Sequence, residues 1–113
     1  MVALTNYAET VRDILTRVAG HLKKLPKPGV ETLLIEDAAL GVFLLRRLGW
    51  HAGDRIDNAV IFARVRDGKV WIEDDHTDLS FFDELVRAGV PEADIVVGFQ
   101  PPGSRFHPQQ AVA

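Results

Sequence analysis

The chain has 113 residues, enough for one modest hydrophobic core and too few for two domains. Hydrophobic residues make up 47% and charged residues 26%, which excludes general disorder. Thirteen basic and sixteen acidic residues give a net charge of −3, which argues against a domain that clamps nucleic acid by itself, because phosphate neutralisation supplies most of such binding. The absence of cysteine excludes disulfides and thiolate chemistry. Without a leader-like start or a long apolar run, we expect a cytoplasmic protein.

An amphipathic helix is expected over residues 6–24. Asn6 and Glu9 are three residues apart, as in a capping box, and apolar residues then recur at helical spacing. Pro26 and Pro28 prevent the helix from continuing. We expect this helix to cover one face of a sheet.

Four strands are expected next, over residues 30–36, 41–48, 56–65 and 70–74. Residues 49–54 contain two glycines and polar residues, which predicts a loop. Asp67-Gly68 predicts a two-residue hairpin turn, since both central residues of a type I′ turn need positive φ.

The turn at Asp67-Gly68 sets the register of this hairpin. Residues directly opposite each other share a face, so the hairpin divides into two surfaces. The predicted pairs are Val65 with Val70, Arg64 with Trp71, Ala63 with Ile72, and Phe62 with Glu73. The face expected to join the core carries Ile61, Ala63, Val65, Val70 and Ile72. The opposite face carries Phe62, Arg64, Arg66, Lys69, Trp71 and Glu73.

Two interpretations of that opposite face remain open. Arg64 could stack over Trp71 on an exposed sheet, a contact worth about 0.5–1 kcal/mol. The face could instead be a protein interface, where tryptophan and arginine are enriched. The residues of this interface hypothesis are Phe62, Arg64, Arg66, Trp71 and, from the tail, Arg105.

A second helix is expected over residues 78–88, then a strand over 95–98 and a proline-rich tail over 100–113. Thr77 or Asp78 is the predicted N-cap of this helix. Gly89 is expected to have positive φ at the helix end, and Pro91 prevents continuation.

The strongest candidate for chemistry is the acidic run from Glu73 to Asp78, which includes His76 and could supply hard metal ligands. Helix capping already accounts for these acidic residues, and strand alternation points Glu73 and Asp74 to opposite faces. The only Asp-x-Lys sequence lies in the hairpin turn, and no nucleophile elbow or phosphate-binding glycine motif is present. We therefore expect no catalytic residue, no metal, no cofactor and no enzymatic activity, with a small hydrolase using residues 74–78 as an alternative.

Several segments together resemble the XisI family, small factors named for controlling excision of the fdxN DNA element in cyanobacteria. The matching positions are Gly49, Trp50, Arg55, Gly68, Lys69, Trp71, Asp75, Thr77, Gly89, Pro91, Asp94, Gly98 and Phe99. Pro101-Pro102, Arg105 and Ala111-Val112-Ala113 match the end of the family pattern. This chain departs from that pattern at Phe62, Glu73 and His76, where the family usually carries histidine, often glutamine, and usually glycine.

The expected fold is a single α+β domain of order α-β-β-β-β-α-β, with a mainly antiparallel sheet and the helices on one face. The resemblance implies a non-enzymatic control factor that works as a regulatory subunit with a nuclease-like XisH-type partner. It further implies a link to site-specific recombination by a separate recombinase. A homodimer is possible. The alternative is a DNA-binding accessory module that uses Arg64, Arg66, Lys69 and Trp71.

Overall fold

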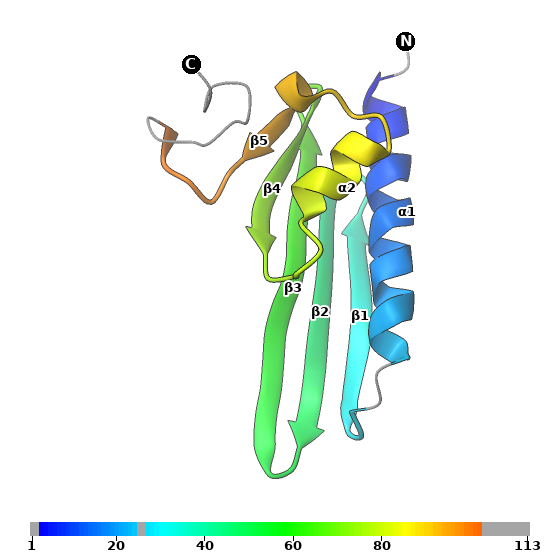
Figure 1. Cartoon of the computed structure of the whole chain (residues 1–113), viewed down its shortest axis with the longest axis vertical. Helices are drawn as coiled ribbons and strands as arrows, with labels where there is room; N and C mark the ends of the chain where they lie inside the picture. Colours follow the sequence, from blue (N-terminus) through cyan, green and yellow to red (C-terminus); the bar gives the residue numbers. More distant parts are fainter. Residues whose placement is uncertain (1–2, 25–26, 103–113) are drawn as a thin grey trace.

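Two helices lie on one face of a five-stranded sheet (Figure 1). The computed structural model describes residues 3–24 and 27–102, with side chains described from residue 7. The elements are α1 (Ala3–Lys23), β1 (Val30–Asp37), β2 (Val42–His51), β3 (Asp54–Arg66), β4 (Lys69–Asp75), α2 (Phe81–Arg87), a 3-10 turn (Glu92–Asp94) and β5 (Ile95–Val97). The strands lie in chain order, antiparallel except for the parallel pair β4–β5. This is the α+β fold expected from the sequence.

The core lies between the helices and the sheet. Helix α1 contributes a stripe at spacings of three and four residues, Val11, Ile14, Leu15 and Val18, all buried. The sheet contributes Phe43, Leu45, Ile61, Ala63, Val70, Ile72 and Ile95, and α2 contributes Phe81 and Leu85. Of the predicted core face of the β3–β4 hairpin, only Val65 is partly rather than fully buried. Within the described residues, neither helix is long and apolar enough to cross a bilayer.

Strands β2 and β3 form a long hairpin arm, and the prediction of a loop over 49–54 is wrong. The strands continue to His51 and from Asp54, joined by a two-residue turn in which Ala52 and Gly53 have φ of 52° and 86°. That geometry matches the right-handed twist of the flanking strands, so pairing continues up to the turn. Gly49 lies within β2, and this position requires glycine because its backbone passes close to Gly29. A Cβ at residue 49 would lie 1.9 Å from the Gly29 carbonyl oxygen.

The β3–β4 hairpin keeps the predicted register for three pairs and then shifts. Ala63 pairs with Ile72 as expected, but Phe62 pairs with Asp74, so the predicted Phe62–Glu73 pair is wrong. Glu73 is the extra residue of a bulge. Because one added residue reverses the faces of all that follow, Asp75 lies on the helix side, where unbroken alternation would have placed it on the opposite face.

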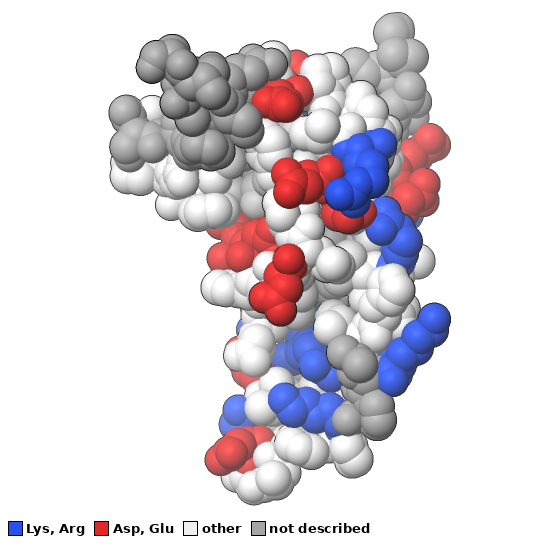
Figure 2. Space-filling view, in the orientation of Figure 1, with Lys and Arg blue, Asp and Glu red and all other residues white. Residues whose placement is uncertain are grey.

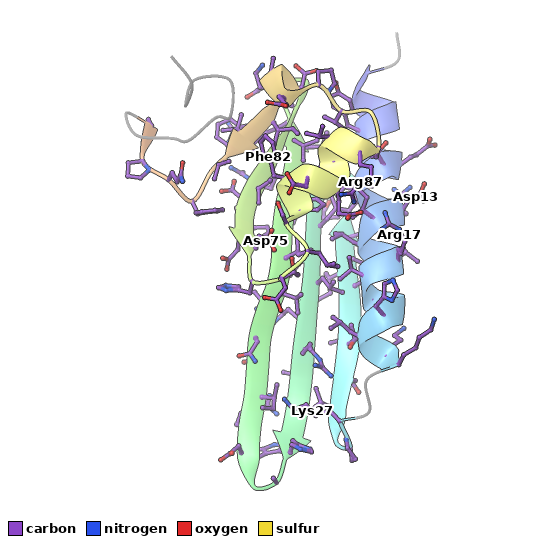
Figure 3. All side chains as sticks on the ribbon, viewed as in Figure 1. Asp13, Arg17, Lys27, Asp75, Phe82 and Arg87 are labelled. Carbon is purple, nitrogen blue, oxygen red and sulfur yellow. The ribbon has the colours of Figure 1, made fainter. Side chains whose placement is uncertain are left out.

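Helix α2 begins at Phe81, and the prediction that Thr77 or Asp78 caps it is wrong. The N-cap is Ser80, whose Oγ accepts a hydrogen bond from the Asp83 N–H at 3.2 Å. Asp75, at the end of β4, also caps the start of the helix (Figure 3). Its Oδ2 accepts from the Phe81 N–H at 2.8 Å, a helix-start donor that otherwise lacks a partner. Helix α1 likewise begins earlier than predicted, at Ala3 rather than Asn6.

Asp75 also orders the connection before the helix. Its Oδ1 accepts from the Thr77 backbone N–H at 2.9 Å and from the Thr77 hydroxyl at 2.7 Å. Both carboxylate oxygens of Asp75 are therefore occupied by groups of this one segment.

The prediction for the end of α2 is confirmed. Gly89 has φ of 101°, the Gly89 N–H donates to the Val86 carbonyl, and the Val90 N–H donates to the Leu85 carbonyl, both at 3.0 Å. These two bonds define a Schellman motif, which requires a left-handed residue at Gly89. Val90 and Leu85 are both buried in the core, which fixes the exit of the chain.

Gly89→Ala is expected to lower the free energy of unfolding by about 1 kcal/mol, because a β-carbon disfavours the left-handed conformation. Among the described residues other than Gly89 and its two chain neighbours, no heavy atom lies within 4 Å of the added Cβ, so the cost arises from the backbone conformation of Gly89. Gly20→Ala is the matched control: Gly20 lies in α1 with equally open surroundings, and the change should stabilise by roughly 0.5–1 kcal/mol. Urea unfolding of both variants measures this, and destabilisation by Gly20→Ala equal to that by Gly89→Ala would contradict it.

One buried carboxylate joins the two helices. Glu84 of α2 is 8% exposed, and its Oε1 accepts from the Arg17 guanidinium of α1 at 2.9 Å. Its Oε2 accepts from Arg87, and Figure 3 shows Arg17 and Arg87 extending toward each other from the two helices. The hydrogen bond from Arg17, with that from Arg87, lowers the pKa of Glu84 despite its partial burial.

This lowered pKa predicts a loss of stability in acid. A carboxyl whose pKa is lower in the folded state stabilises fully above its unfolded pKa and loses that contribution as the pH falls through its folded value. The urea concentration at the unfolding midpoint should therefore decrease once the pH is lowered below about 4.5. Glu84→Gln should show a shallower fall, with Glu36 and Asp57 supplying the remainder because their pKa values are also lowered. Identical pH profiles for the two proteins would contradict this assignment.

Candidate protein interface on the uncovered sheet face

No described helix covers the sheet face opposite α1 and α2, which we call the open face (Figure 1). Phe43, Leu45, Ala63 and Ile72 point into the core, so their neighbours along each strand point to the open face. The apolar residues of the open face are Leu33, Ile35, Val42, Leu44, Leu48, Trp50, Phe62 and Trp71. Its charged residues include Arg46, Arg55, Asp57, Arg64, Arg66, Lys69 and Glu73.

An apolar row crosses three strands of the open face. Ile35 pairs with Leu44, and Leu44 pairs with Phe62, so these three side chains are direct cross-strand neighbours. Ile35 is 47% exposed, although it is a large β-branched residue. Contiguous apolar surface of this kind on a monomer marks a binding surface more often than isolated exposed residues do.

Aromatic residues lie at both ends of the open face, each with an arginine. Arg66 lies over the Trp71 ring, 4.8 Å from its centroid. Arg55 lies 5.6 Å from the centroid of Trp50, which is 59% exposed. Tryptophan and arginine are the residues most enriched where binding energy concentrates.

The interpretation in which Arg64 stacks over Trp71, one of the two left open by the sequence, is wrong in its choice of arginine. Arg64 Nε instead donates to Glu73 Oε2 at 2.8 Å, because the bulge leaves Glu73 beside Arg64 on the open face. Arg66, one residue pair nearer the turn, stacks on Trp71 in its place.

Acidic neighbours compensate most cations of this face. Arg46 pairs with Asp57, whose pKa is lowered chiefly by that hydrogen bond. Lys69 Nζ lies 3.9 Å from Asp94 Oδ1, and Arg66 Nε lies 3.3 Å from Asp67 Oδ2. A phosphate backbone requires cations that are free to replace its counterions, so this pairing favours a protein surface over nucleic acid. On the helix side, Figure 2 shows basic and acidic side chains interspersed.

The acidic run does not converge on one point. Glu73 binds Arg64, Asp75 binds the start of α2, and Asp74 Oδ1 lies 2.9 Å from His76 Nε2. Across residues 3–24 and 27–102, no group of three or more histidine or acidic residues is arranged to hold a metal ion. The arrangement serves helix capping and ion pairing.

The structure brings together Phe62, Arg64, Arg66 and Trp71 on the open face, and Arg105 lies outside the described residues. Sequence reasoning missed the part of this surface on β1 and β2. The signal was present: apolar residues on both faces of 42–48 indicate a strand with no solvated side. Only the pairing of β1 with β2 shows which of them face outward.

Comparisons with known proteins agree with this architecture. The family model described as "XisI protein" matches residues 1–112. The crystal structure of a XisI-like protein from Anabaena variabilis is 36% identical, with a TM-score of 0.84 over 90% of this chain and 92% of that one. The crystal structure of fdxN element excision controlling factor XisI from the same organism is 32% identical, with a TM-score of 0.77 over 90% and 97% of the two chains.

A search of curated proteins found no match. The family model spans nearly the whole sequence, and each of the two similar structures covers 90% of this chain. The chain belongs to the XisI family.

Proposed function

We propose that this chain is a non-enzymatic control factor that acts as a regulatory binding subunit in excision of a DNA element by site-specific recombination. The similar Anabaena variabilis protein that bears the name of an excision controlling factor supports this role. The observation that carries the binding part is the open face, with its apolar row Ile35–Leu44–Phe62 and its arginine-stacked tryptophans.

The partner proposed for the open face is a nuclease-like XisH-type protein. A protein partner fits the chemistry of this face because its apolar row needs burial, while most of its cations are already paired within the chain. A DNA-binding accessory role for Arg64, Arg66, Lys69 and Trp71 is less well supported for the same reason.

Binding to a co-expressed XisH-type protein tests the proposal. Trp71→Ala and Phe62→Ala should each weaken the complex by on the order of tenfold or more, while thermal unfolding remains cooperative. Leu40→Ala is the matched control, because Leu40 is 69% exposed in the β1–β2 turn and is not part of the open face. Isothermal titration calorimetry measures the affinities.

Three results would contradict the proposal. The complex could fail to form, or it could form with unchanged affinity in both open-face variants. Trp71→Ala could instead convert a stable homodimer to monomers without any effect on a partner, which would assign the open face to self-association. Salt-sensitive binding of the isolated chain to duplex DNA, lost on Arg66→Gln, would support the DNA-binding alternative.

The non-enzymatic part has its own test. The purified chain should cleave neither DNA nor a phosphoester in the presence of Mg²⁺ or Mn²⁺. The triple variant Asp74→Asn, Asp75→Asn, His76→Gln should therefore change stability or partner affinity. It should have no effect on turnover, because the wild-type chain should show none. Metal-dependent cleavage by the wild-type chain that the triple variant loses would overturn this part.

A further inference from the structure

Half of strand β3 has no neighbour on the β4 side among the described residues. Strand β3 runs from Asp54 to Arg66, but β4 pairs with it only between Ile61 and Arg66. The His76 N–H donates to the Val60 carbonyl at 2.8 Å, and beyond His76 the chain is no longer paired with β3. Residues 54–59 are therefore a free strand edge, visible in Figure 1 as the part of β3 that extends beyond the end of β4.

The turn register shows which backbone groups this edge presents. A two-residue turn makes its flanking pair, His51 and Asp54, a hydrogen-bonded pair. Hydrogen-bonded and non-bonded pairs alternate, so Arg55, Asp57 and Ala59 direct their N–H and C=O groups away from β2. An unpaired row of this kind is a template for an added strand.

A groove runs beside the free edge on the helix side. It encloses about 850 Å³ between the C-terminal half of α1, the arm, and the connection from β4 to α2. Val18, Leu22, Val60 and Leu79 give it apolar walls, and Leu79 is 50% exposed there. Figure 2 shows basic side chains of the arm below an acidic side chain near the β4–α2 connection.

Arg47 lies in this groove with an unused hydrogen-bond donor. Its Nε is buried and has no hydrogen-bond partner among the described residues. A buried donor of this kind is stabilised by an acceptor, and a carboxylate suits a guanidinium best. Asp74 and Asp78 also line the groove, and their negative charge disfavours a phosphate or nucleic acid, which carries more negative charge than a single carboxylate.

We propose that the free edge of β3 and this groove form a strand-addition site for an extended segment of a partner protein. Backbone groups of the segment pair with Arg55, Asp57 and Ala59. Its alternate side chains enter the groove, apolar against Leu22, Val60 and Leu79, with a carboxylate near Arg47. Backbone pairing gives affinity in this mode and the groove gives selectivity. This site uses the backbone of Arg55 and Asp57, whose side chains lie on the open face, and a groove on the opposite, helix side of the sheet. It stands whether or not the open face binds an XisH-type protein.

The probe is a fluorescein-labelled six-residue peptide that alternates valine and threonine, with glutamate in place of the central valine. Titrated into the full chain, it should bind with a Kd below about 1 mM. Backbone amide NMR signals of Arg55, Asp57 and Ala59 should shift. The same peptide N-methylated at alternate amides should not bind, because it cannot pair with the edge.

Variants of the chain distinguish peptide binding in the groove from non-specific binding. Leu79→Asp should weaken binding by on the order of tenfold, while Leu40→Asp, an equivalent change at an exposed leucine in the β1–β2 turn, should not. Arg47→Gln should abolish the preference for the glutamate peptide over its glutamine analogue. Trp71→Ala should leave peptide binding unchanged, which keeps this test independent of the open face.

Several outcomes would overturn the proposal: no binding at about 1 mM, equal binding of the N-methylated peptide, or amide shifts confined to residues outside 54–59. Binding that requires prior removal of residues 103–113 would assign the site to the chain's own tail and would also overturn it.

Discussion

Gly49→Ala is expected to lower the free energy of unfolding by about 3 kcal/mol or more, because the added methyl group meets backbone atoms that cannot move aside. The new Cβ would lie 1.9 Å from the Gly29 carbonyl oxygen and 2.9 Å from the Gly29 carbonyl carbon. The same carbonyl accepts a hydrogen bond from the Trp50 N–H at 3.0 Å. The clash therefore cannot be relieved by a side-chain rotation, and the β1–β2 pairing must open at this end.

Gly53→Ala provides the control for this prediction. Gly53 lies in the turn of the same arm with φ of 86°, and, apart from its two chain neighbours, no heavy atom of the described residues lies within 4 Å of an added Cβ. Its change should cost only about 1 kcal/mol through the backbone. Urea unfolding followed by tryptophan fluorescence measures both variants. Equal losses for Gly49→Ala and Gly53→Ala would mean that the close approach to Gly29 is not the cause.

Asp75→Ala should lower the free energy of unfolding by roughly 2–3 kcal/mol. The variant removes three hydrogen bonds to one carboxylate, from the Thr77 N–H, the Thr77 hydroxyl and the Phe81 N–H. Bonds to a charged acceptor contribute more than neutral ones, and loss of a helix cap alone costs about 1 kcal/mol. Because Phe81 is buried at 1% exposure, the frayed helix start would also loosen the core.

The neighbouring acidic residue distinguishes capping from general charge. Asp78 is exposed, and Asp78→Ala should change stability by less than about 0.5 kcal/mol. Asp75→Asn keeps one acceptor oxygen and should fall between the two alanine variants. Chemical denaturation of all three settles the ranking, and a loss for Asp78→Ala as large as that for Asp75→Ala would contradict the assigned role.

Local signals in the sequence determined much of this molecule. The Asp67-Gly68 turn correctly predicted the pairs from Val65–Val70 to Ala63–Ile72, because a two-residue turn leaves no freedom in the first pairs after it. Gly89 correctly predicted the end of α2, because a Schellman motif is built from residues adjacent in the chain. The family resemblance was carried by short motifs in the same segments, and the family match over residues 1–112 confirms it.

Other features depend on contacts between segments that are distant in the sequence. The segment 49–54 carries two glycines, and only the approach of Gly29 to Gly49 shows that Gly49 belongs to a paired strand. The bulge at Glu73 places Asp75 at the start of α2, so the capping residue lies six positions before the N–H that it binds, beyond the local spacing of cap motifs.

The candidate surfaces divide in the same way. Alternation around Asp67-Gly68 predicted that Phe62, Arg64, Arg66 and Trp71 share a face, since side-chain direction in a strand is a local property. The pairing of β1 with β2 decided that Ile35 and Leu44 extend that face. The end of β4 pairing at Ile61 leaves the rest of β3 with a free edge beside a groove. The sequence alone determined which residues alternate, and tertiary structure decided which strands end, which faces remain uncovered and which charges meet, because those outcomes depend on packing between distant segments.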